Sequence, residues 1–262
     1  MTFAERLDEV IERTASLLCV GLDPDGLSSA ADVERFCDEI LGATLEHVCA
    51  VKANAAFFEQ HGAAGYRVLE RVRAKVPRDR LLIIDGKRGD IANTSAAYAR
   101  ALFDVLGADA VTVNPLMGGD AVAPFLERAD RGVFLLTRTS NQGASDLLDE
   151  PMADARPLHA HIVELGLGWD PGGTVGFVVG ATDAAAVSAV RSLAGDAPLL
   201  LPGIGAQGGA LEQSVRAGVS ARGRRLLVAV SRGITQSPEG ASRAAASLAE
   251  RITKVRRAGA AA

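Results

Sequence analysis

The chain of 262 residues is long enough to bury a sizeable core, and 48% of its residues are hydrophobic, which excludes an intrinsically disordered protein. Its formal net charge of −4 gives no general attraction for polyanions, so any phosphate contact must be local. Only 4% of the residues are aromatic, so the interleaved aromatic and basic residues of single-strand nucleic-acid binders are missing, and we expect no nucleic-acid partner.

The N-terminal segment predicts an amphipathic, charged helix over residues 2–13. It lacks the continuous apolar stretch of a signal peptide, and no segment reaches transmembrane length, so we expect a cytoplasmic protein with no membrane partner. The three cysteines (Cys19, Cys37 and Cys49) contain no CxxC pair. We interpret them as buried, unreactive thiols of a reducing compartment rather than as metal ligands.

Short apolar runs recur along the chain and predict eight strands. Each run is continuous rather than alternating, which is typical of strands buried on both faces in a parallel sheet. The runs cover residues 17–22, 48–52, 81–85, 109–113, 132–137, 174–179, 198–202 and 225–230.

Segments with helical spacing lie between these runs. The clearest cover residues 56–75 and 93–106, the second with Gly107 as its expected stop, and another helix is expected near 155–167. The connection at 138–151 is long for a loop between a strand and a helix, so it is a candidate lid or binding loop.

Eight strand–helix units in this length predict a single (β/α)₈ barrel domain spanning residues 1–262, with a frayed tail over 256–262. A doubly wound open sheet is the alternative fold. The first strand is not followed by a GxGxxG motif, which argues against a dinucleotide-binding version of that alternative.

Charged residues end three adjacent strands of the predicted barrel. Asp23 ends the first strand, Lys52 ends the second, and Asp85 ends the third, where Lys87 follows. Catalytic residues of this fold sit at the carboxyl ends of the strands, so these four charges predict an active site.

The segment Asp85-Gly86-Lys87-Arg88-Gly89-Asp90 is the sharpest signal in the sequence. Asp85 and Lys87 are two residues apart, so along a strand both point to the same side, here into the barrel. They could instead form a partly buried ion pair with no catalytic role. Asp90, at the expected start of the next helix, could be an N-cap.

Two segments predict a phosphate site. Residues 202–209 (PGIGAQGG), beginning with Pro202, follow the seventh strand, and Ser231-Arg232-Gly233 follows the eighth. The loops after these strands form the usual phosphate cradle of the fold, where glycines expose backbone N–H groups and an arginine can bind two phosphate oxygens. The glycines alone could equally mark an ordinary turn.

The remaining polar candidates are weaker. The four histidines share no strand end, so we expect no histidine metal site. Ser140, in the long connection after the fifth strand, could donate a hydrogen bond to a polar ring or could be an ordinary loop residue.

Together these residues resemble the orotidine 5′-phosphate decarboxylase family over residues 17–234. The D-x-K-x-x-D run at Asp85, Lys87 and Asp90 carries the resemblance. GLDPD at 21–25, VKAN at 51–54, LTRTSN at 136–141 and LPGIGAQGG at 201–209 support it, and TRTSN and the length resemble the longer, second subgroup. The resemblance implies decarboxylation of orotidine 5′-monophosphate to uridine 5′-monophosphate (UMP), the last step of pyrimidine nucleotide synthesis, with no cofactor and no metal.

The resemblance also implies a role for each charged residue. Asp23 and Lys52 would hold the ribose hydroxyls, with Lys52 part of an alternating Lys-Asp-Lys-Asp network. Asp85 would face the substrate carboxylate, and Lys87 would deliver a proton to C6. Asp85 could act either by repelling the carboxylate in the ground state or by orienting Lys87 and keeping it charged.

Other implied roles concern the partner subunit, the base and the phosphate. Asp90, Ile91 and Thr94 would enter the site from the second subunit of a homodimer. Ser140 would hydrogen-bond the pyrimidine, and the phosphate side would comprise Pro202, Gln207, Ser231 and Arg232. Ser231 departs from the glycine that often precedes the phosphate arginine in this family.

Two alternatives remain open at this point. A related sugar-phosphate lyase or synthase would share the third-strand motif but would place an acidic residue on the second strand and use Mg²⁺. Lys52 at that position is unfavourable for a divalent cation. A catalytically silent nucleotide-binding barrel is the second alternative.

Overall fold

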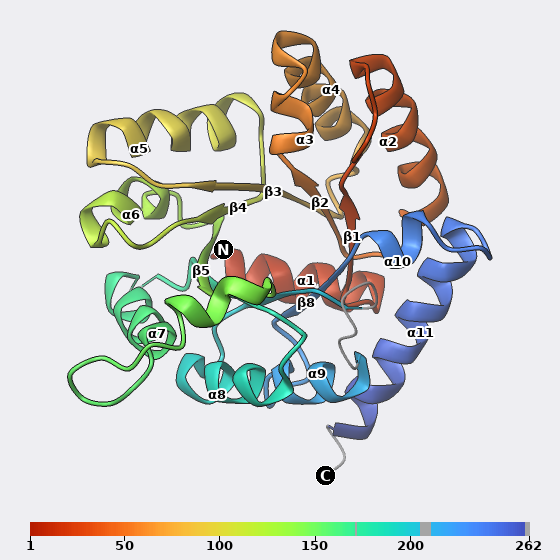
Figure 1. The fold of residues 1–262 in the computed structure, drawn as a ribbon. Coiled ribbons are helices and arrows are strands. Elements are labelled where there is room, and N and C mark those ends of the chain that lie inside the picture. Colours follow the sequence, from red (N-terminus) through yellow and green to blue (C-terminus); the bar gives the residue numbers. More distant parts are fainter. Residues whose placement is uncertain (171, 205–210, 260–262) are drawn as a thin grey trace.

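The computed structural model describes residues 1–170, 172–204 and 211–259. Within them, eight parallel strands form a closed barrel in sequence order, with β8 pairing back onto β1 (Figure 1). This confirms the predicted (β/α)₈ barrel and excludes the alternative fold, a doubly wound open sheet. The strands are β1 (Leu18–Leu22), β2 (Ala50–Asn54), β3 (Leu81–Arg88), β4 (Ala110–Val113), β5 (Gly132–Arg138), β6 (Val175–Val179), β7 (Leu199–Pro202) and β8 (Leu226–Val230).

Most of the helices surround the barrel as a ring, and α1 lies across it (Figure 1). They are α1 (Phe3–Thr14), α2 (Ala30–Thr44), α3 (Ala56–Glu59), α4 (Gly62–Lys75), α5 (Ala92–Ala99), the π-helix η1 (Arg100–Val105), α6 (Gly119–Leu126), the 3₁₀ helix η2 (Gln142–Asp146), α7 (Leu158–Trp169), α8 (Ala184–Ala194), α9 (Leu211–Gly218), α10 (Arg232–Thr235) and α11 (Ala241–Gly259). In the described part of the chain, no helix combines the length and the apolar sequence needed to cross a membrane.

Three helical expectations need correction. The helix expected over 56–75 is divided into α3 and α4, because the chain turns through a left-handed Gly62 and packs Gly65 against the carbonyl of Phe58. The helix expected over 93–106 becomes a π-helix from residue 100, and Gly107 (φ 77°) ends it as expected. Helix α11 includes residues 256–259, which were expected to be frayed; buried Ile252 and Val255 anchor its last turns. Residues 260–262 lie outside the described part.

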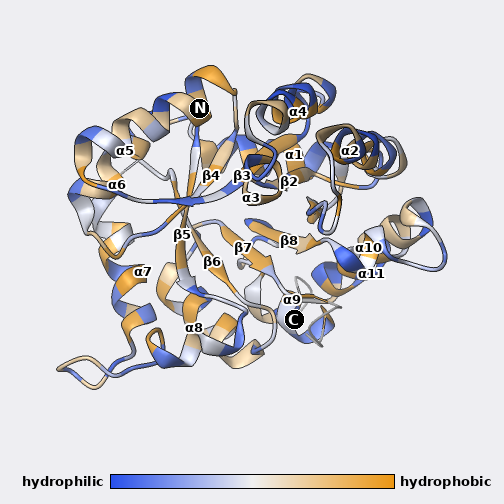
Figure 2. Cartoon of the chain, turned by 45° about the horizontal axis from the view of Figure 1, so that its top comes forward, coloured by the Kyte–Doolittle hydropathy of each residue, from blue (hydrophilic) through white to orange (hydrophobic). Residues whose placement is uncertain are grey.

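The continuous apolar runs are buried as expected. Every residue of β1, β6 and β8 is buried, and β6 and β7 are coloured mostly as hydrophobic in Figure 2. The three cysteines are free and buried, and burial raises the pKa values of the Cys19 and Cys37 thiols to about 12. These thiols are therefore protonated at neutral pH and unreactive.

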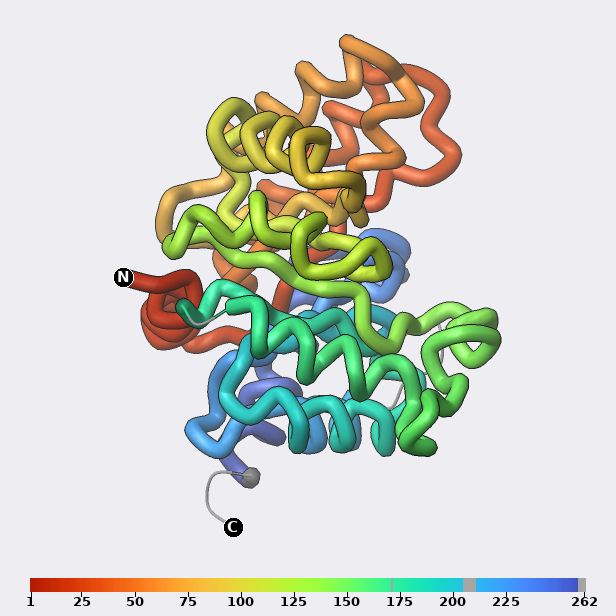
Figure 3. The backbone as a smooth tube through the Cα atoms, turned by 90° about the vertical axis from the view of Figure 1, so that its left-hand side faces the viewer, coloured from red at the N-terminus to blue at the C-terminus, as the bar shows by residue number. Residues whose placement is uncertain are grey.

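Helix α1 closes the amino-terminal end of the barrel. A capping box between Thr2 and Glu5 begins the helix. The Phe3 ring packs edge-on against Phe134 of β5, with the ring centroids 5.9 Å apart. Gly132 makes room for Phe3, because a Cβ there would lie 2.5 Å from its ring. In Figure 3, α1 lies at one end of the barrel and the segment between β5 and α7 lies at the other.

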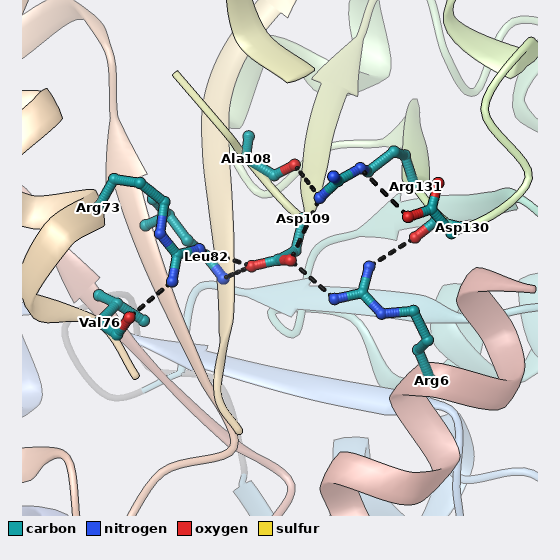
Figure 4. Close-up of polar contacts among 8 residues, drawn as sticks. All are labelled: Arg6, Arg73, Val76, Leu82, Ala108, Asp109, Asp130 and Arg131. Carbon is teal, nitrogen blue, oxygen red and sulfur yellow. Dashed lines mark hydrogen bonds and ion pairs between the residues drawn. The ribbon is translucent and has the colours of Figure 1, made fainter. Parts of the chain in front are cut away.

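A buried carboxylate joins several elements at this amino-terminal end (Figure 4). Asp109, which precedes β4, accepts hydrogen bonds from Arg6 of α1 and Arg73 of α4, both at 2.8 Å. It also accepts the backbone N–H of Leu82 at 2.9 Å and an N–H of Arg131 at 3.4 Å. One carboxylate thus holds three arginines from different parts of the ring, far along the barrel from its open end.

Candidate active site

A cavity of about 350 Å³ opens at the carboxyl ends of the strands, where the fold places active sites. It has the size and the mixture of apolar wall and convergent polar groups typical of a small-molecule site. Its lining residues are Gly21, Asp23, Lys52, Asn54, Asp85, Lys87, Thr112, Leu136, Thr139, Ser140, Asn141, Val178, Leu200, Pro202, Gly203, Ile204, Ala229, Val230, Ser231 and Arg232.

The four charges expected at the strand ends meet on one wall of the cavity. Asp85 is central: its Oδ2 accepts a hydrogen bond from Lys52 Nζ at 3.0 Å, and its Oδ1 accepts one from Lys87 Nζ at 2.7 Å. Asp23 Oδ1 lies 3.6 Å from Lys52 Nζ on the other side. The result is a row of alternating charges, Asp23–Lys52–Asp85–Lys87, from three neighbouring strands.

Burial and charge act in opposite directions in this row. Burial raises the pKa of Asp85, but the ammonium groups of Lys52 and Lys87 outweigh it and hold this pKa well below its ordinary value. Burial lowers the pKa of Lys52, but the carboxylates of Asp85 and Asp23 outweigh it and raise this pKa above its ordinary value. Both Asp85 and Lys52 are therefore charged at neutral pH.

The two lysines differ in exposure. The Lys52 side chain is 8% exposed, whereas that of Lys87 is 48% exposed. Lys52 is therefore a fixed charge inside the wall, and Lys87 presents its ammonium group to the open cavity. Asp85 and Lys87 do form the partly buried ion pair that was considered from the sequence. Because both residues line the cavity, a bound molecule could contact the pair.

The side of the cavity formed by β7 and β8 carries most of the expected phosphate residues. Pro202, Ser231 and Arg232 line it, and α10 begins at Arg232. Gln207 lies outside the described residues. Ser231 fits because position 21 is glycine: a Cβ on Gly21 would lie 2.8 Å from the Ser231 Cβ.

Ser140 also lines the cavity, and the long connection that carries it is anchored at several points. Arg138 forms a two-pronged ion pair with Asp149, at 2.9 and 2.8 Å. His159 Nδ1 lies 2.9 Å from the Leu148 carbonyl oxygen. Ser140 packs against Gly180, where a Cβ would lie 2.6 Å from the Ser140 Cα. The connection is thus anchored at both ends, and its Thr139, Ser140 and Asn141 line the cavity.

Asp90, Ile91 and Thr94 are not among the residues that line the cavity of their own chain. Asp90 does not cap helix α5, because the N-cap of α5 is Ile91, which makes no side-chain capping bond. Instead, Asp90 Oδ1 accepts a hydrogen bond from the Ile91 N–H at 2.7 Å. The Ile91 side chain is a large hydrophobic group that is 57% exposed. The N-cap interpretation of Asp90 is therefore wrong.

A model of the "Orotidine 5′-phosphate decarboxylase / HUMPS family" matches residues 16–247. The chain belongs to this family.

Full-length relatives agree with this assignment. The orotidine 5′-phosphate decarboxylase of Roseiflexus castenholzii is 48% identical over 254 residues, covering 94% of this chain and 93% of the relative. That of Thermomicrobium roseum is 45% identical over 272 residues, covering 97% of each chain. The solved structure of Leishmania donovani OMP decarboxylase superimposes with a TM-score of 0.91 at 41% identity, covering 98% of this chain and 99% of that one.

Within this member of the family, sequence reasoning missed four polar residues of the site, of which Thr139 and Asn141 lie in the connection after β5. Thr112 of β4 and Asn54 of β2 line the cavity. Thr112 is the one polar residue in the strand AVTV, and Asn54 follows Lys52 by two positions, so the strand-end rule could have found both. The apolar part of the wall was also not predicted, and it includes Leu136, Val178, Leu200, Ile204, Ala229 and Val230.

Nothing in the described residues resembles a metal centre: no group of three or more histidine, cysteine or acidic side chains is placed to hold an ion. On β2 the cavity is lined by Lys52, whose ammonium group is unfavourable for a divalent cation.

Proposed function

We propose that this chain decarboxylates orotidine 5′-monophosphate to UMP, with Lys52, Asp85 and Lys87 and the partner subunit's Asp90 as its catalytic residues and Asp23 as a substrate-binding residue. Membership of the family supports the reaction. The observation that carries the assignment of residues is the hydrogen bonding of Asp85 to two lysines, one buried and one exposed to the cavity. This arrangement places a proton donor that is exposed to the cavity beside a buried, charged lysine.

Lys87 is the acid in this proposal. Loss of CO₂ from C6 leaves an electron pair on carbon with little delocalisation, so the site must stabilise it electrostatically. The Lys87 ammonium group brings positive charge and a proton to the cavity, and transfer of that proton to C6 completes the product. The Lys52 ammonium group continues to neutralise the Asp85 carboxylate while Lys87, having given up its proton, is transiently neutral.

Asp85 is proposed to orient Lys87 as its main task. Both of its carboxylate oxygens accept hydrogen bonds from ammonium groups, so its charge is already compensated. A bare carboxylate ~4 Å from that of the substrate would be repelled by ~4 kcal/mol at an effective dielectric constant of ~20, equivalent to a roughly thousandfold effect on rate. Compensation by two lysines reduces this repulsion, which favours the orienting role over ground-state stress.

The rest of the cavity is proposed to hold the nucleotide. Asp23 Oδ1 is buried and has no hydrogen-bond partner among the described residues, so it can accept a ribose hydroxyl beside Lys52. The hydroxyl oxygen of Ser231, next to Arg232, is also buried and has no hydrogen-bond partner among the described residues. Ser231 and Arg232, with Pro202 and Gln207, would form the phosphate side, and Ser140 would hydrogen-bond the pyrimidine.

We further propose a homodimer with shared sites. Asp90, Ile91 and Thr94 do not line their own cavity, and Ile91 exposes a large apolar side chain beside Asp90. Insertion of this corner into the cavity of a second copy would cover the apolar surface and complete the site. The whole chain would form one barrel domain.

The reaction is also proposed to need no cofactor or metal, because Lys52 occupies the place where a cation would need a carboxylate. The unpaired, buried cysteines support action in a reducing compartment, the cytoplasm.

The test is an ultraviolet assay for loss of orotidine 5′-monophosphate by the purified chain in EDTA, with no added cofactor. We expect rapid, complete conversion to UMP. No conversion by a folded sample would refute the proposed reaction. Activity that EDTA abolishes and Mg²⁺ restores would instead indicate the metal-dependent chemistry of a sugar-phosphate lyase or synthase.

A further inference from the structure

Strand β3 is irregular at the point where it carries Lys87. The pairing of β3 with β4 runs regularly through Ile84 and Val111 but then shifts, so that Arg88 pairs with Val113. Lys87 falls inside this shift and has a φ of 48°, in the left-handed region that a residue with a side chain rarely adopts. Something must hold Lys87 in this conformation.

The side chain of Thr112 supplies that support. Thr112 is 1% exposed and lies on β4 opposite the irregular part of β3. The backbone N–H of Lys87 donates a hydrogen bond to Thr112 Oγ1 at 2.9 Å. The hydroxyl thus replaces the partner that this N–H loses when the strand pairing shifts.

The same hydroxyl also contacts Asp85. Thr112 Oγ1 lies 2.8 Å from Asp85 Oδ1, the oxygen that also accepts a hydrogen bond from the Lys87 ammonium group. An N–H can only donate, so the hydroxyl oxygen must accept from Lys87 and its single proton is free to point at Asp85. The two bonds therefore have a fixed direction: Lys87 backbone to Thr112, and Thr112 to Asp85.

We propose that Thr112 is a positioning residue for the reaction: its hydroxyl fixes both the backbone that carries the Lys87 ammonium group and the carboxylate that aims it. This inference rests on the proposed role of Lys87 as the acid. Thr112 does not transfer a proton itself. It closes a ring of three hydrogen bonds, through Lys87 N–H, Asp85 Oδ1 and Lys87 Nζ, that ties the ammonium group to its own main chain.

The kinetic test compares Thr112→Val, which removes the hydroxyl and keeps the branched shape, with Thr112→Ser, which keeps the hydroxyl. Loss of a hydrogen bond to a charged group predicts a fall in kcat of about 10- to 100-fold in Thr112→Val, with KM changed by less than about threefold. Thr112→Ser should recover kcat to within about threefold of the unchanged chain. The matched control is Thr137→Val, an equally buried threonine of β5 whose hydroxyl, within the described residues, donates only to the Leu135 carbonyl.

A second readout does not depend on catalysis. The chain has four lysines, and Gly86-Lys87 is its one Gly-Lys pair, so ¹³C-carbonyl glycine with ¹⁵N-lysine labelling gives a single carbonyl-to-amide correlation, from the Lys87 N–H. In Thr112→Val we expect this resonance to shift and its hydrogen exchange to accelerate at least about tenfold. In Thr112→Ser and Thr137→Val it should stay in place. If Thr112→Val fails to fold, Thr112→Ala serves as the second variant without the hydroxyl.

The outcomes separate this inference from the proposed function. The inference is overturned if Thr112→Val keeps kcat within about twofold, if Thr112→Ser loses as much activity as Thr112→Val, or if the Lys87 resonance does not respond. An unchanged chain that does not decarboxylate the nucleotide refutes the proposed function instead, and with it any effect of Thr112 on the reaction. In that case the Lys87 resonance still reports whether the hydroxyl supports the left-handed backbone.

Discussion

Substitution of Asp109 by asparagine should destabilise the barrel without changing its chemistry. The Asp109 carboxylate is 4% exposed and is shared by Arg6, Arg73 and Arg131. Asparagine keeps the shape of the side chain but replaces one accepting oxygen with an NH₂ group. That group would face arginine donors, and three guanidinium groups would lose their common counter-charge.

The magnitude follows from the burial of the cluster. Removal of one partner from a buried ion pair costs about 3–5 kcal/mol, because the remaining charge is left without compensation. With an unfolding entropy of about 2.1 cal/mol/K per residue, a chain of this length should lose about 5–9 °C in Tm. The side chains of Arg6 and Arg131 are about one-fifth exposed, so water compensates in part and the lower half of this range is expected.

The assay is thermal unfolding followed by circular dichroism, paired with kcat measured at 25 °C. The matched control is Asp130→Asn, a neighbouring acid that is 54% exposed and lies 3.6 Å from Arg131. It should change Tm by no more than about 1 °C. A Tm for Asp109→Asn within about 2 °C of the unchanged chain would refute the importance of the cluster. A kcat that falls more than about twofold would show that the two ends of the barrel are coupled.

Further predictions concern the site and the thiols. Lys87→Ala should lower kcat by at least about a thousandfold while UMP binding, measured by calorimetry, persists; normal turnover would remove Lys87 as the acid. Arg232→Ala should lower kcat/KM about 100-fold mainly by raising KM, and an unchanged KM would contradict its contact with phosphate. The pKa of Asp85 is lowered by folding, so its ionised form should stabilise the chain above roughly pH 4 and lose this effect as the pH falls through the lowered pKa. The gap in unfolding free energy between the unchanged chain and Asp85→Asn should therefore be constant above that pH and shrink below it. At pH 8 the folded chain should not react with a thiol-specific disulfide reagent, and reaction of three thiols should follow denaturation.

The barrel was predictable because each buried strand is a continuous apolar run. All eight runs became strands with ends shifted by two or three residues at most. The helical boundaries were less predictable. The break after α3 depends on Gly65 meeting the Phe58 carbonyl, and the last turns of α11 depend on burying Val255; both are contacts that helical spacing does not encode.

The charged part of the site was predictable for a similar local reason. Parallel strands in sequence order bring their carboxyl ends to one rim, so Asp23, Lys52, Asp85 and Lys87 had to be neighbours once the barrel was assumed. The rule that residues two apart on a strand share a side placed Lys87 correctly, although its backbone is left-handed and the strand is irregular there.

By itself, the sequence determined the repeating strand–helix order and the rim on which the charges gather, because both follow from local pattern and chain direction. Only the tertiary structure decided the hydrogen bonds that set the ionisation and orientation of these charged side chains. Asp85 is held ionised by lysines on its own and the neighbouring strand, and Thr112 reaches it from β4, 27 residues along the chain. Such pairings depend on register, side-chain direction and burial, which are set when the barrel closes and not by the residues adjacent in sequence.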